Sequence, residues 1–571
     1  MPVRGSGKQT AVETVGLRSS ALLLAAALLA ALAATWPLVL APGSAIPRGT
    51  ELTGTPMLHD LWSLWWTADR AAHGFQGIWN APIFFPQQGA FTFSDPKLLL
   101  GVASAPLWAL GLPPALCYNF VLVAVLALNG LAAGRLALAL GAGRPAAAIG
   151  SVLAAALPFT AKMSGVLTVL SFFGLLFAVE GLVRFSGSGS WRTAFQAVCG
   201  FAVQCLSAEQ IALLGAPLLL LASWAALAGR GFTRAATLRL ALAAALALAL
   251  VLAVLAPTLR VHRELGFARS ESAVSLGSAT IGDFFTRPLG ASVGIPPRES
   301  LERDPSGLFP GVLLLLLAAA GALDGFGRRS RWTLVLVVAA GAAAVVALGL
   351  NVNLFGWRPF AWLRAGIPWF SELRSPFRSA TVVQALLAVL AALGIEAAGR
   401  RCRGPAWRSA ILGLGLLGAA ENLSVPAALF PIPATPGTAW TAWLRSQPRG
   451  GAAVHLPLPG GGSVAAFEIE TWRMFRQIDH RVPLLNGYAA YFPAGYEELQ
   501  KLLGAAPTYS ALCALSKTAG VTTVIVDRQS TLSQRLFEDP EVHRLLTPAF
   551  RDDAVLIFRL VPSGADCIAR P

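Results

Sequence analysis

Long apolar segments separated by short arginine-bearing loops run through most of the chain. A membrane-spanning helix needs about 20 consecutive, mainly apolar residues, and windows of this length predict about eleven transmembrane helices. The predicted spans cover residues 19–41, 116–140, 145–161, 164–184, 192–208, 209–229, 237–258, 309–326, 332–351, 377–399 and 408–429. A further apolar segment, Leu98 to Leu112, is shorter and is interrupted by Pro and Gly.

The distribution of arginine decides how this short segment is interpreted. If 98–112 does not cross the membrane, almost all the basic short loops lie on one side, as the positive-inside rule requires for the cytoplasm. We therefore interpret 98–112 as interfacial or re-entrant, with residues 1–18 in the cytoplasm and the C-terminus outside. The transmembrane region is then 19–429. Its external loops are 42–115, 259–308 and 352–376. The first span is expected to be an uncleaved anchor; a cleaved signal peptide is the alternative.

Residues 430–571 differ in kind, because charge density rises and short β-like runs appear. The expected strands are Ala452–Pro457, Val521–Val526 and Ala554–Arg559, and Tyr496–Leu503 is expected to be helical. About 140 residues suffice for one core, so this segment is predicted to be a small extracytoplasmic α/β domain. Cys513 and Cys567 lie here, either as a disulfide or as two free thiols.

Composition supports the membrane assignment. Of the 571 residues 55% are hydrophobic and only 13% are charged, with a mean hydropathy of +0.62, whereas a soluble protein has about 25% charged residues. The net charge of +15 does not indicate nucleic-acid binding, because the basic residues lie between apolar spans rather than along one soluble face. The fold class is therefore a polytopic α-helical membrane protein of a cell (inner or plasma) membrane.

One polar segment stands out, directly after the first span. Asp60 follows His59 and lies close to Trp62, Trp65 and Trp66, residues that favour a membrane–water interface. An acid in a Trp-rich loop at the bilayer surface is what an enzyme acting on a lipid-linked substrate needs. The structural alternative for Asp60 is a helix cap or a loop salt bridge.

Several short motifs together resemble one family. They are the Asp in the Trp-rich first loop, Phe84-Phe85-Pro86, Leu308-Phe-Pro-Gly311, Arg374-Ser-Pro-Phe-Arg378 and His480-Arg-Val-Pro-Leu-Leu-Asn-Gly-Tyr488. In this order they resemble the GT-C superfamily of integral-membrane glycosyltransferases, and most closely its uncharacterised bacterial members. The resemblance implies a sugar donor linked to polyprenyl phosphate and an acceptor, of unassigned identity, outside the cytoplasm. The chain departs from better-known members in having one acid, not a pair, in this loop.

Transfer from a polyprenyl phosphate needs a base for the acceptor or a carboxylate that stabilises positive charge on the sugar, and cations for the leaving phosphate. Asp60 is the candidate catalytic carboxylate, with Asp95 and His59 as candidates for a second acid or metal ligand. The candidate phosphate-binding residues are Arg374, Arg378, Lys97 and Arg303. A divalent cation such as Mg²⁺ or Mn²⁺ is a candidate cofactor without an assigned ligand set.

Two other classes stay open. A transporter or flippase needs ionisable residues near mid-membrane, but Glu180, Glu209, Glu396 and Glu421 cluster at the ends of the predicted spans. The second alternative is a non-catalytic envelope scaffold derived from the glycosyltransferase fold.

Overall fold

A computed structural model describes residues 16–288, 305–353, 355–402, 404–448, 450–460, 462–504, 508–518, 520–530 and 542–561. The chain divides into two compact units. Unit 1 consists of residues 1–41, 120–254 and 268–429, and unit 2 of residues 42–119, 255–267 and 430–571. Unit 2 thus joins the sequence after the first predicted span to the C-terminal segment, although more than 300 residues separate them along the chain.

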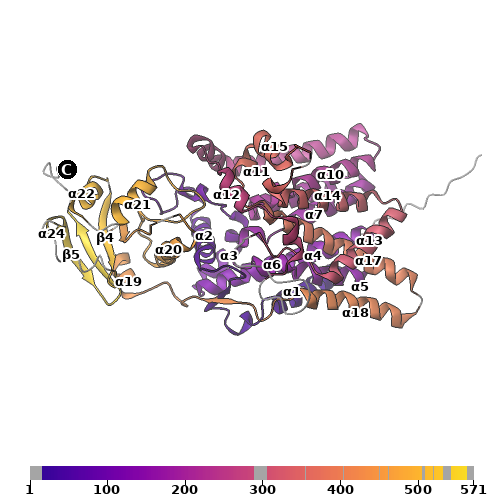
Figure 1. Ribbon diagram of the computed structural model, residues 1–571, viewed down its shortest axis with the longest axis horizontal. Coiled ribbons are helices and arrows are strands. Elements are labelled where there is room, and N and C mark those ends of the chain that lie inside the picture. Colours follow the sequence, from indigo (N-terminus) through magenta and orange to yellow (C-terminus); the bar gives the residue numbers. More distant parts are fainter. Residues whose placement is uncertain are drawn as a thin grey trace, which may run out of the picture. The chain divides into compact units, whose positions relative to one another are not determined.

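Unit 1 is helical (Figure 1). Its helices are α1 (Leu17–Ala34), α5 (Arg144–Ala155), α6 (Pro158–Lys162), α7 (Phe173–Ser188), α8 (Trp191–Ser207), α9 (Glu209–Leu214), α10 (Ala216–Ala228), α12 (Glu271–Leu276), α13 (Val312–Gly327), α14 (Arg331–Ala347), α15 (Pro359–Gly366), α16 (Pro368–Glu372), α17 (Ala380–Arg401) and α18 (Pro405–Asn422). Two helices, α4 (Pro114–Ala139) and α11 (Arg234–Leu265), have residues in both units. The short 3-10 helices of unit 1 are η1 (Leu38–Leu40), η3 (Leu167–Val169), η4 (Ile281–Phe285), η5 (Gly349–Asn351) and η6 (Pro376–Ser379), whereas η2 (Ala90–Phe93) and η7 (Ala465–Phe467) belong to unit 2.

Each predicted span contains a helix of the structure, with local breaks. The segment 145–161 is split before Pro158 into α5 and α6. In the segment 164–184, the α-helix α7 begins only at Phe173, after the short 3-10 helix η3. Among the described residues, six segments are long and apolar enough to cross a membrane. They are Leu17–Ala34, Pro114–Ala139, Arg144–Lys162, Leu167–Ser188, Arg234–Leu265 and Pro376–Arg401. The number of crossings therefore stays a prediction.

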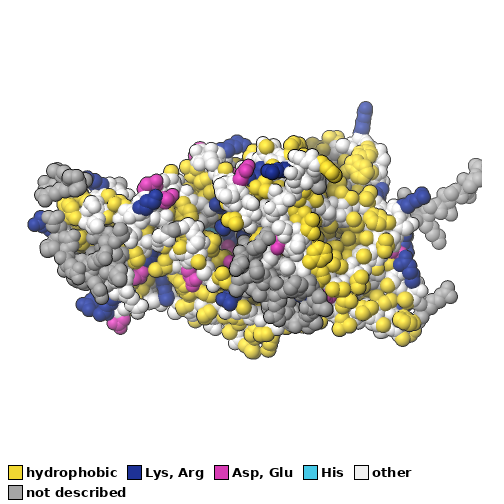
Figure 2. Space-filling model, in the orientation of Figure 1, with side chains coloured by type: hydrophobic (Ala, Val, Ile, Leu, Met, Phe, Trp, Pro, Cys, Tyr) yellow, Lys and Arg dark blue, Asp and Glu magenta, His cyan; other side chains and the backbone are white. Residues whose placement is uncertain are grey.

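Small residues allow the helices of unit 1 to approach closely. A Cβ added at Gly394 of α17 would lie 1.9 Å from the carbonyl oxygen of Leu317 in α13, and one at Gly321 would lie 2.1 Å from that of Leu390. Helices in membranes associate through such close backbone contacts. The outer surface of unit 1 carries many large apolar side chains, among them Leu242, Leu246 and Leu250 of α11, and Figure 2 shows hydrophobic side chains spread over the helical region. This surface suits a lipid environment.

Unit 2 combines helices with a small sheet (Figure 1). Its helices are α2 (Thr55–Ala72), α3 (Leu98–Ala109), α19 (Ala439–Ser446), α20 (Glu468–His480), α21 (Tyr496–Gly504), α22 (Tyr509–Lys517) and α24 (Val542–Leu545). The strands β3 (Ala452–Leu456), β4 (Val521–Asp527), β5 (Leu546–Arg551) and β6 (Val555–Leu560) form a sheet of order β3-β4-β6-β5. A separate two-stranded sheet pairs β1 (Ala45–Pro47) with β2 (Leu429–Pro431).

The three strands expected in 430–571 are present as β3, β4 and β6, and α21 occupies the expected helical segment. Strand β3 runs parallel to β4, with Val454 opposite Val524, and β4 runs antiparallel to β6, with Ile525 opposite Ile557. Trp440 and Leu444 of α19 pack on this sheet. Cys513 of α22 is disulfide-bonded, which decides between the two alternatives for this thiol, while Cys567 lies outside the described residues.

The Trp-rich segment differs from its expected form in two ways. It is an 18-residue helix, α2, rather than a loop. Trp62, Trp65 and Trp66 are 1%, 4% and 7% exposed, so their rings pack inside the protein rather than face lipid or solvent. The expectation failed because an aromatic-rich amphipathic sequence suits protein packing as well as an interface; here α3 and α20 cover the helix.

Candidate active site

The candidate carboxylate lies on α2 and faces a lysine from the start of α3. Pro56 favours the start of α2, and Gly74 in the left-handed conformation follows its end. Helix α3 approaches α2 closely because Gly101 faces Thr67; a Cβ there would lie 2.4 Å from the Thr67 Cβ. This packing places the Nζ of Lys97 3.1 Å from Oδ1 of Asp60.

Asp60 and Lys97 form a buried ion pair. Their side chains are 6% and 2% exposed. The Lys97 ammonium also donates a hydrogen bond to the carbonyl oxygen of Asp95 at 2.8 Å. Lys97 has a φ of 49°, a conformation uncommon for a residue with a side chain. Desolvating two charges costs free energy that their attraction offsets only in part, so a buried ion pair is weak evidence for added stability. We therefore treat Asp60 and Lys97 as a candidate functional pair.

The neighbourhood of Asp60 favours the ionised carboxylate. Burial by itself raises the pKa of Asp60, but the positive charge of Lys97 and the interaction with His59 outweigh it and hold the pKa below its usual value. Burial lowers the pKa of His59, so this ring is neutral at physiological pH. Its Nδ1 lies 3.7 Å from Oδ1 of Asp60. An acid held in its charged form is a weak base but a good stabiliser of positive charge.

Two motifs from distant parts of the sequence meet beside this pair. The backbone N–H groups of Phe84 and Phe85 donate to the carbonyl oxygens of Asn486 and Leu484, at 3.1 and 2.9 Å. The Phe-Phe-Pro motif is therefore paired with the Asn-Gly-Tyr stretch within unit 2. The Tyr488 ring of that stretch meets His59 edge to face, with ring centroids 5.6 Å apart.

Helix α20 of the C-terminal segment holds α2 in position. The Nε1 of Trp62 donates to Oε1 of Gln477 at 3.0 Å, and the Oγ1 of Thr55 donates to the carbonyl oxygen of Val464 at 2.9 Å. The Gln477 amide also donates to the carbonyl oxygen of Val482 at 3.0 Å. Figure 1 shows α20 beside α2, in agreement with their packing. The orientation of the helix that bears Asp60 thus depends on residues more than 400 positions away.

A buried polar network connects α20 to the sheet. The Nε2 of His455 lies 2.8 Å from Oδ1 of Asp527, and Arg473 donates to Oδ2 of Asp527 at 2.7 Å. Asn486 donates to Glu470 at 3.1 Å and accepts from the His455 backbone at 2.7 Å. Burial by itself raises the pKa of Asp527, but the interactions with His455 and Arg473 outweigh it and hold the pKa below its usual value. This network fixes the Asn-Gly-Tyr stretch against α20.

The remaining predicted site residues lie partly in unit 2, partly in unit 1 and partly outside the described residues. Asp95 is half-buried and contacts Lys97 through its carbonyl oxygen. Arg378, in η6 of unit 1, donates to Oε1 of Gln210 at 2.9 Å, and Arg374 is exposed. Arg303 lies outside the described residues. Within the described part of the chain, no three His, Cys, Asp or Glu side chains are grouped to hold a metal ion.

The sequence singled out Asp60, His59 and Lys97 as candidates, and the structure brings these side chains together. It assigned Lys97 to the donor phosphate and did not predict the pairing of Lys97 with Asp60. A separation of 37 positions, bridged by an irregular segment, gives no periodic signal for such a contact. It also missed Gln477 and the network around Asp527, because a glutamine or aspartate that bonds to distant segments has no local signature in the sequence.

No protein-family model matches the chain, and no curated protein matches it. Its structure is similar to that of the arabinofuranosyltransferase AftD from Mycobacteria, with 16% identity, a TM-score of 0.58, and coverage of 96% of this chain and 40% of that one. A second structure of that enzyme gives 15% identity, a TM-score of 0.57, and coverage of 97% and 42%. An oligosaccharyltransferase from Archaeoglobus fulgidus matches at 14% identity and a TM-score of 0.45, covering 96% and 75%.

The likeness to AftD shows the fold. The chain shares the fold of the matched part of AftD, and it is a multi-pass helical membrane protein with six described segments long and apolar enough to cross a membrane. It spans about two fifths of the length of AftD, since 40% of that enzyme is covered.

Proposed function

We propose that this protein is a membrane glycosyltransferase that moves a sugar from a polyprenyl-phosphate donor to an acceptor outside the cytoplasm. The observation that carries the proposal is the buried Asp60–Lys97 pair, with 3.1 Å between Nζ and Oδ1, on a GT-C fold. Asp60 lies directly after the first span, where the resemblance to the GT-C superfamily implies a catalytic Asp in the first external loop.

In the proposed reaction the bond between the sugar anomeric carbon and the phosphate oxygen breaks as the acceptor hydroxyl attacks. Positive charge develops on the sugar and negative charge on the departing phosphate. Asp60, held ionised, stabilises the positive charge and orients the acceptor hydroxyl, whose proton passes to the departing phosphate as the new glycosidic bond forms. Lys97 supplies a cation next to the carboxylate, and we assign it to the leaving phosphate. In unit 1, Arg374 and Arg378 keep the phosphate-binding role predicted from the sequence, because guanidinium groups suit phosphate oxygens.

The transporter alternative finds less support in unit 1. Glu180, fully buried, pairs with Arg135 and Arg184 at 3.0 and 2.9 Å, and Glu421 pairs with Arg287 at 2.7 Å. Acids already neutralised by arginine at helix ends do not offer a site for a coupling ion. The non-catalytic scaffold has no observation in its favour, and we retain it as the outcome if transfer fails.

The decisive experiment incubates the purified full-length protein with radiolabelled polyprenyl-phosphate sugars. An arabinofuranosyl donor is tested first because AftD is an arabinofuranosyltransferase, and hexosyl and pentosyl donors follow. We expect sugar release or transfer from one donor, with and without added Mg²⁺ or Mn²⁺. Absence of turnover with every donor, from protein that elutes as a single species, would favour the scaffold.

A further inference from the structure

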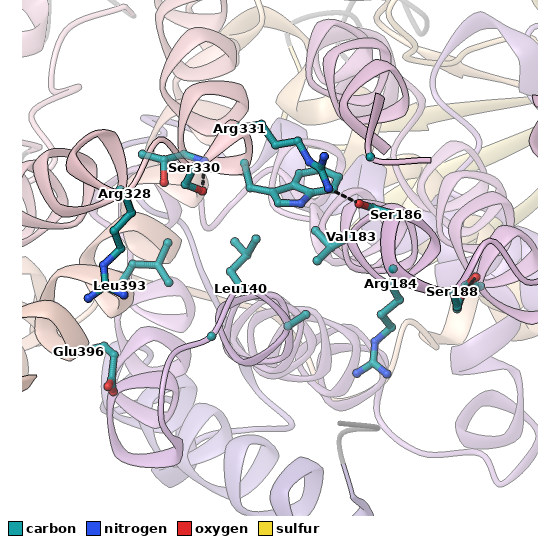
Figure 3. Close-up of a pocket in the computed structure, with 18 of the residues that line it drawn as sticks. Leu140, Val183, Arg184, Ser186, Ser188, Arg328, Ser330, Arg331, Leu393 and Glu396 are labelled. Atoms are coloured by element: carbon teal, nitrogen blue, oxygen red, sulfur yellow. Dashed lines mark hydrogen bonds between the residues drawn. The ribbon is translucent and has the colours of Figure 1, made fainter. Parts of the chain in front are cut away.

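A cavity of about 1070 Å³ opens at one end of the helices of unit 1 (Figure 3). Its walls come from the ends of seven helices, α4, α7, α8, α10, α13, α14 and α17. The loops at these helix ends are the arginine-bearing ones that the positive-inside rule assigns to the cytoplasm. This cavity shares no residue with the candidate active site.

The cavity carries an excess of positive charge. Six arginines and two acids line it, a difference of four positive charges. The arginines are Arg184, Arg192, Arg230, Arg328, Arg331 and Arg400. The acid Asp324 pairs with Arg328 at 2.9 Å and with Arg400 at 2.8 Å. Arg184 pairs with Glu180 at 2.9 Å.

The other three arginines have no acidic partner among the described residues. The Nη2 of Arg331 donates to Oγ of Ser186 at 2.6 Å, a bond visible in Figure 3, and Nη1 of Arg230 donates to the carbonyl oxygen of Gly187 at 3.2 Å. The Nε of Arg230 is buried and has no hydrogen-bond partner in the described part of the chain. A buried guanidinium N–H without an acceptor is costly, and an anionic oxygen in the cavity would remove that cost.

Glycines fit the backbone closely around two of these side chains. A Cβ added at Gly229 would lie 2.3 Å from Nη2 of Arg331, and one at Gly189 would lie 2.9 Å from Nε of Arg230. The guanidinium group of Arg230 is half-buried against Gly189, and that of Arg331, an exposed residue, lies against Gly229 and donates to Ser186, so both groups already have a fixed position beside the cavity.

The cavity also has apolar walls. Figure 3 shows Leu140, Val183 and Leu393 around the space between Arg328 and Arg331. Charge next to apolar side chains at a helix end is the combination that an anionic lipid recognises, with its phosphate on basic residues and its acyl chain on apolar ones. The volume exceeds what one phosphate group fills.

We propose that this cavity binds the phosphodiester headgroup of an anionic phospholipid, with Arg230 and Arg331 as the main phosphate ligands. Arg192 contributes a further positive charge at the cavity wall. Lipid binding at this site does not depend on the proposed glycosyl transfer, so it can be tested even if the protein transfers no sugar.

The test measures lipid retention by the full-length protein in detergent, using native mass spectrometry with equal amounts of phosphatidylglycerol and phosphatidylcholine. We expect wild-type protein to prefer phosphatidylglycerol, and Arg230→Gln/Arg331→Gln to weaken its apparent Kd by about tenfold or more, since each arginine near a lipid phosphate contributes substantially. The matched control, Arg234→Gln/Arg408→Gln, removes two charges from α11 and α18 outside the cavity and should leave the preference unchanged.

Other outcomes overturn the proposal. Equal binding of the two lipids, or equal losses in the two double variants, would show that the cavity selects no anionic lipid. Displacement of the lipid by millimolar inorganic phosphate, with the same dependence on Arg230 and Arg331, would make the cavity a site for free phosphate instead. If the cavity double variant does not elute as a single species, Arg192→Gln at an exposed position serves in its place and should lower the preference severalfold.

Discussion

Asp60 carries the functional claim at the residue scale. Asp60→Asn keeps the volume of the side chain but removes its negative charge, so we expect the rate of sugar transfer to fall by about 10²–10⁴. Asp69→Asn is the control on the same helix; Asp69 pairs with Arg481 at 2.7 Å, away from Lys97. Transfer by the Asp60 variant at close to the wild-type rate would end the assignment.

The ion pair itself allows catalysis to be separated from stability. Asp60→Asn leaves the Lys97 ammonium buried without its counter-charge, which costs about 3–5 kcal/mol of folding stability. Adding Lys97→Met removes that charge as well. We therefore expect the double variant to regain much of the thermal stability while transfer stays low. Recovery of transfer together with stability would mean that the pair has only a structural function.

The direction of the Asp60 pKa predicts a pH profile. Because Lys97 and His59 hold the pKa of this carboxyl below its usual value, Asp60 stays ionised when the pH falls from 7 to 5. An ordinary Asp has a pKa of about 3.9. The plot of log kcat/KM against pH should therefore have no acid limb from Asp60 in this range. A limb centred near about pH 6 that disappears in the Asp60 variant would contradict this ionisation state.

For the phosphate we predict that Arg378→Ala raises the apparent donor KM more than it lowers kcat. The phosphate is present in the ground state and in the transition state, so losing the arginine weakens the binding of both states equally and raises KM. Arg364→Ala, in α15 of the same unit, is the control, because Arg364 donates to the carbonyl oxygen of Arg269 at 2.6 Å. A loss confined to kcat would assign Arg378 another function.

At the scale of elements, Gln477 links α20 to α2. Gln477→Leu leaves Nε1 of Trp62 buried without its acceptor, which costs about 1–3 kcal/mol. We expect a lower thermal midpoint and reduced transfer, since α2 bears Asp60. Gln500→Leu is the matched control, because Gln500 of α21 donates only to the carbonyl oxygen of Pro459 among the described residues. Equal effects of the two variants would argue against a link specific to α2.

Acid should weaken unit 2 through the C-terminal end of α20. Burial lowers the pKa of His480 to about 3, whereas an unfolded His has a pKa of about 6.5. Below pH 6.5 the unfolded chain binds a proton that the folded chain excludes, so stability is lost as the pH falls from 6.5 towards 3. The tryptophan-fluorescence melting midpoint should drop between pH 7 and 5, and less so in His480→Asn. His73→Asn, with a side chain that is 56% exposed, should leave the drop unchanged.

The sequence predicted elements better than contacts. Apolar runs located the helices of unit 1, and alternating runs located β3, β4 and β6, because hydrophobic period and length are local properties. Strand β5, with Pro548 within it, carried no such signal. The helix α2 was missed as a helix, since tryptophan at an interface and tryptophan in a core give the same pattern. The Asp60–Lys97 and Trp62–Gln477 contacts depend on packing between distant segments, which no local pattern encodes.

At the scale of the whole molecule, the orientation in the membrane is the main open prediction. Reporter fusions at positions 143, 188, 232, 330 and 404 should report the cytoplasm, and fusions at 290 and 450 the exterior, because the arginine-bearing loops favour the inside. Opposite signals at 143 and 290 would mean that 98–112 crosses the membrane and that the predicted spans do not number eleven.

The bond between Trp62 and Gln477 joins residues 415 positions apart, and this has a consequence for biosynthesis. At about 5–20 residues per second, ribosomes need roughly 20–80 s to add that length of chain. During this period the newly made α2 lacks α20, the helix that packs on its tryptophans, so the surroundings of Asp60 are incomplete. If the proposed function holds, activity requires nearly the entire polypeptide to be synthesised and inserted, and we expect a chain stalled midway through translation to transfer no sugar.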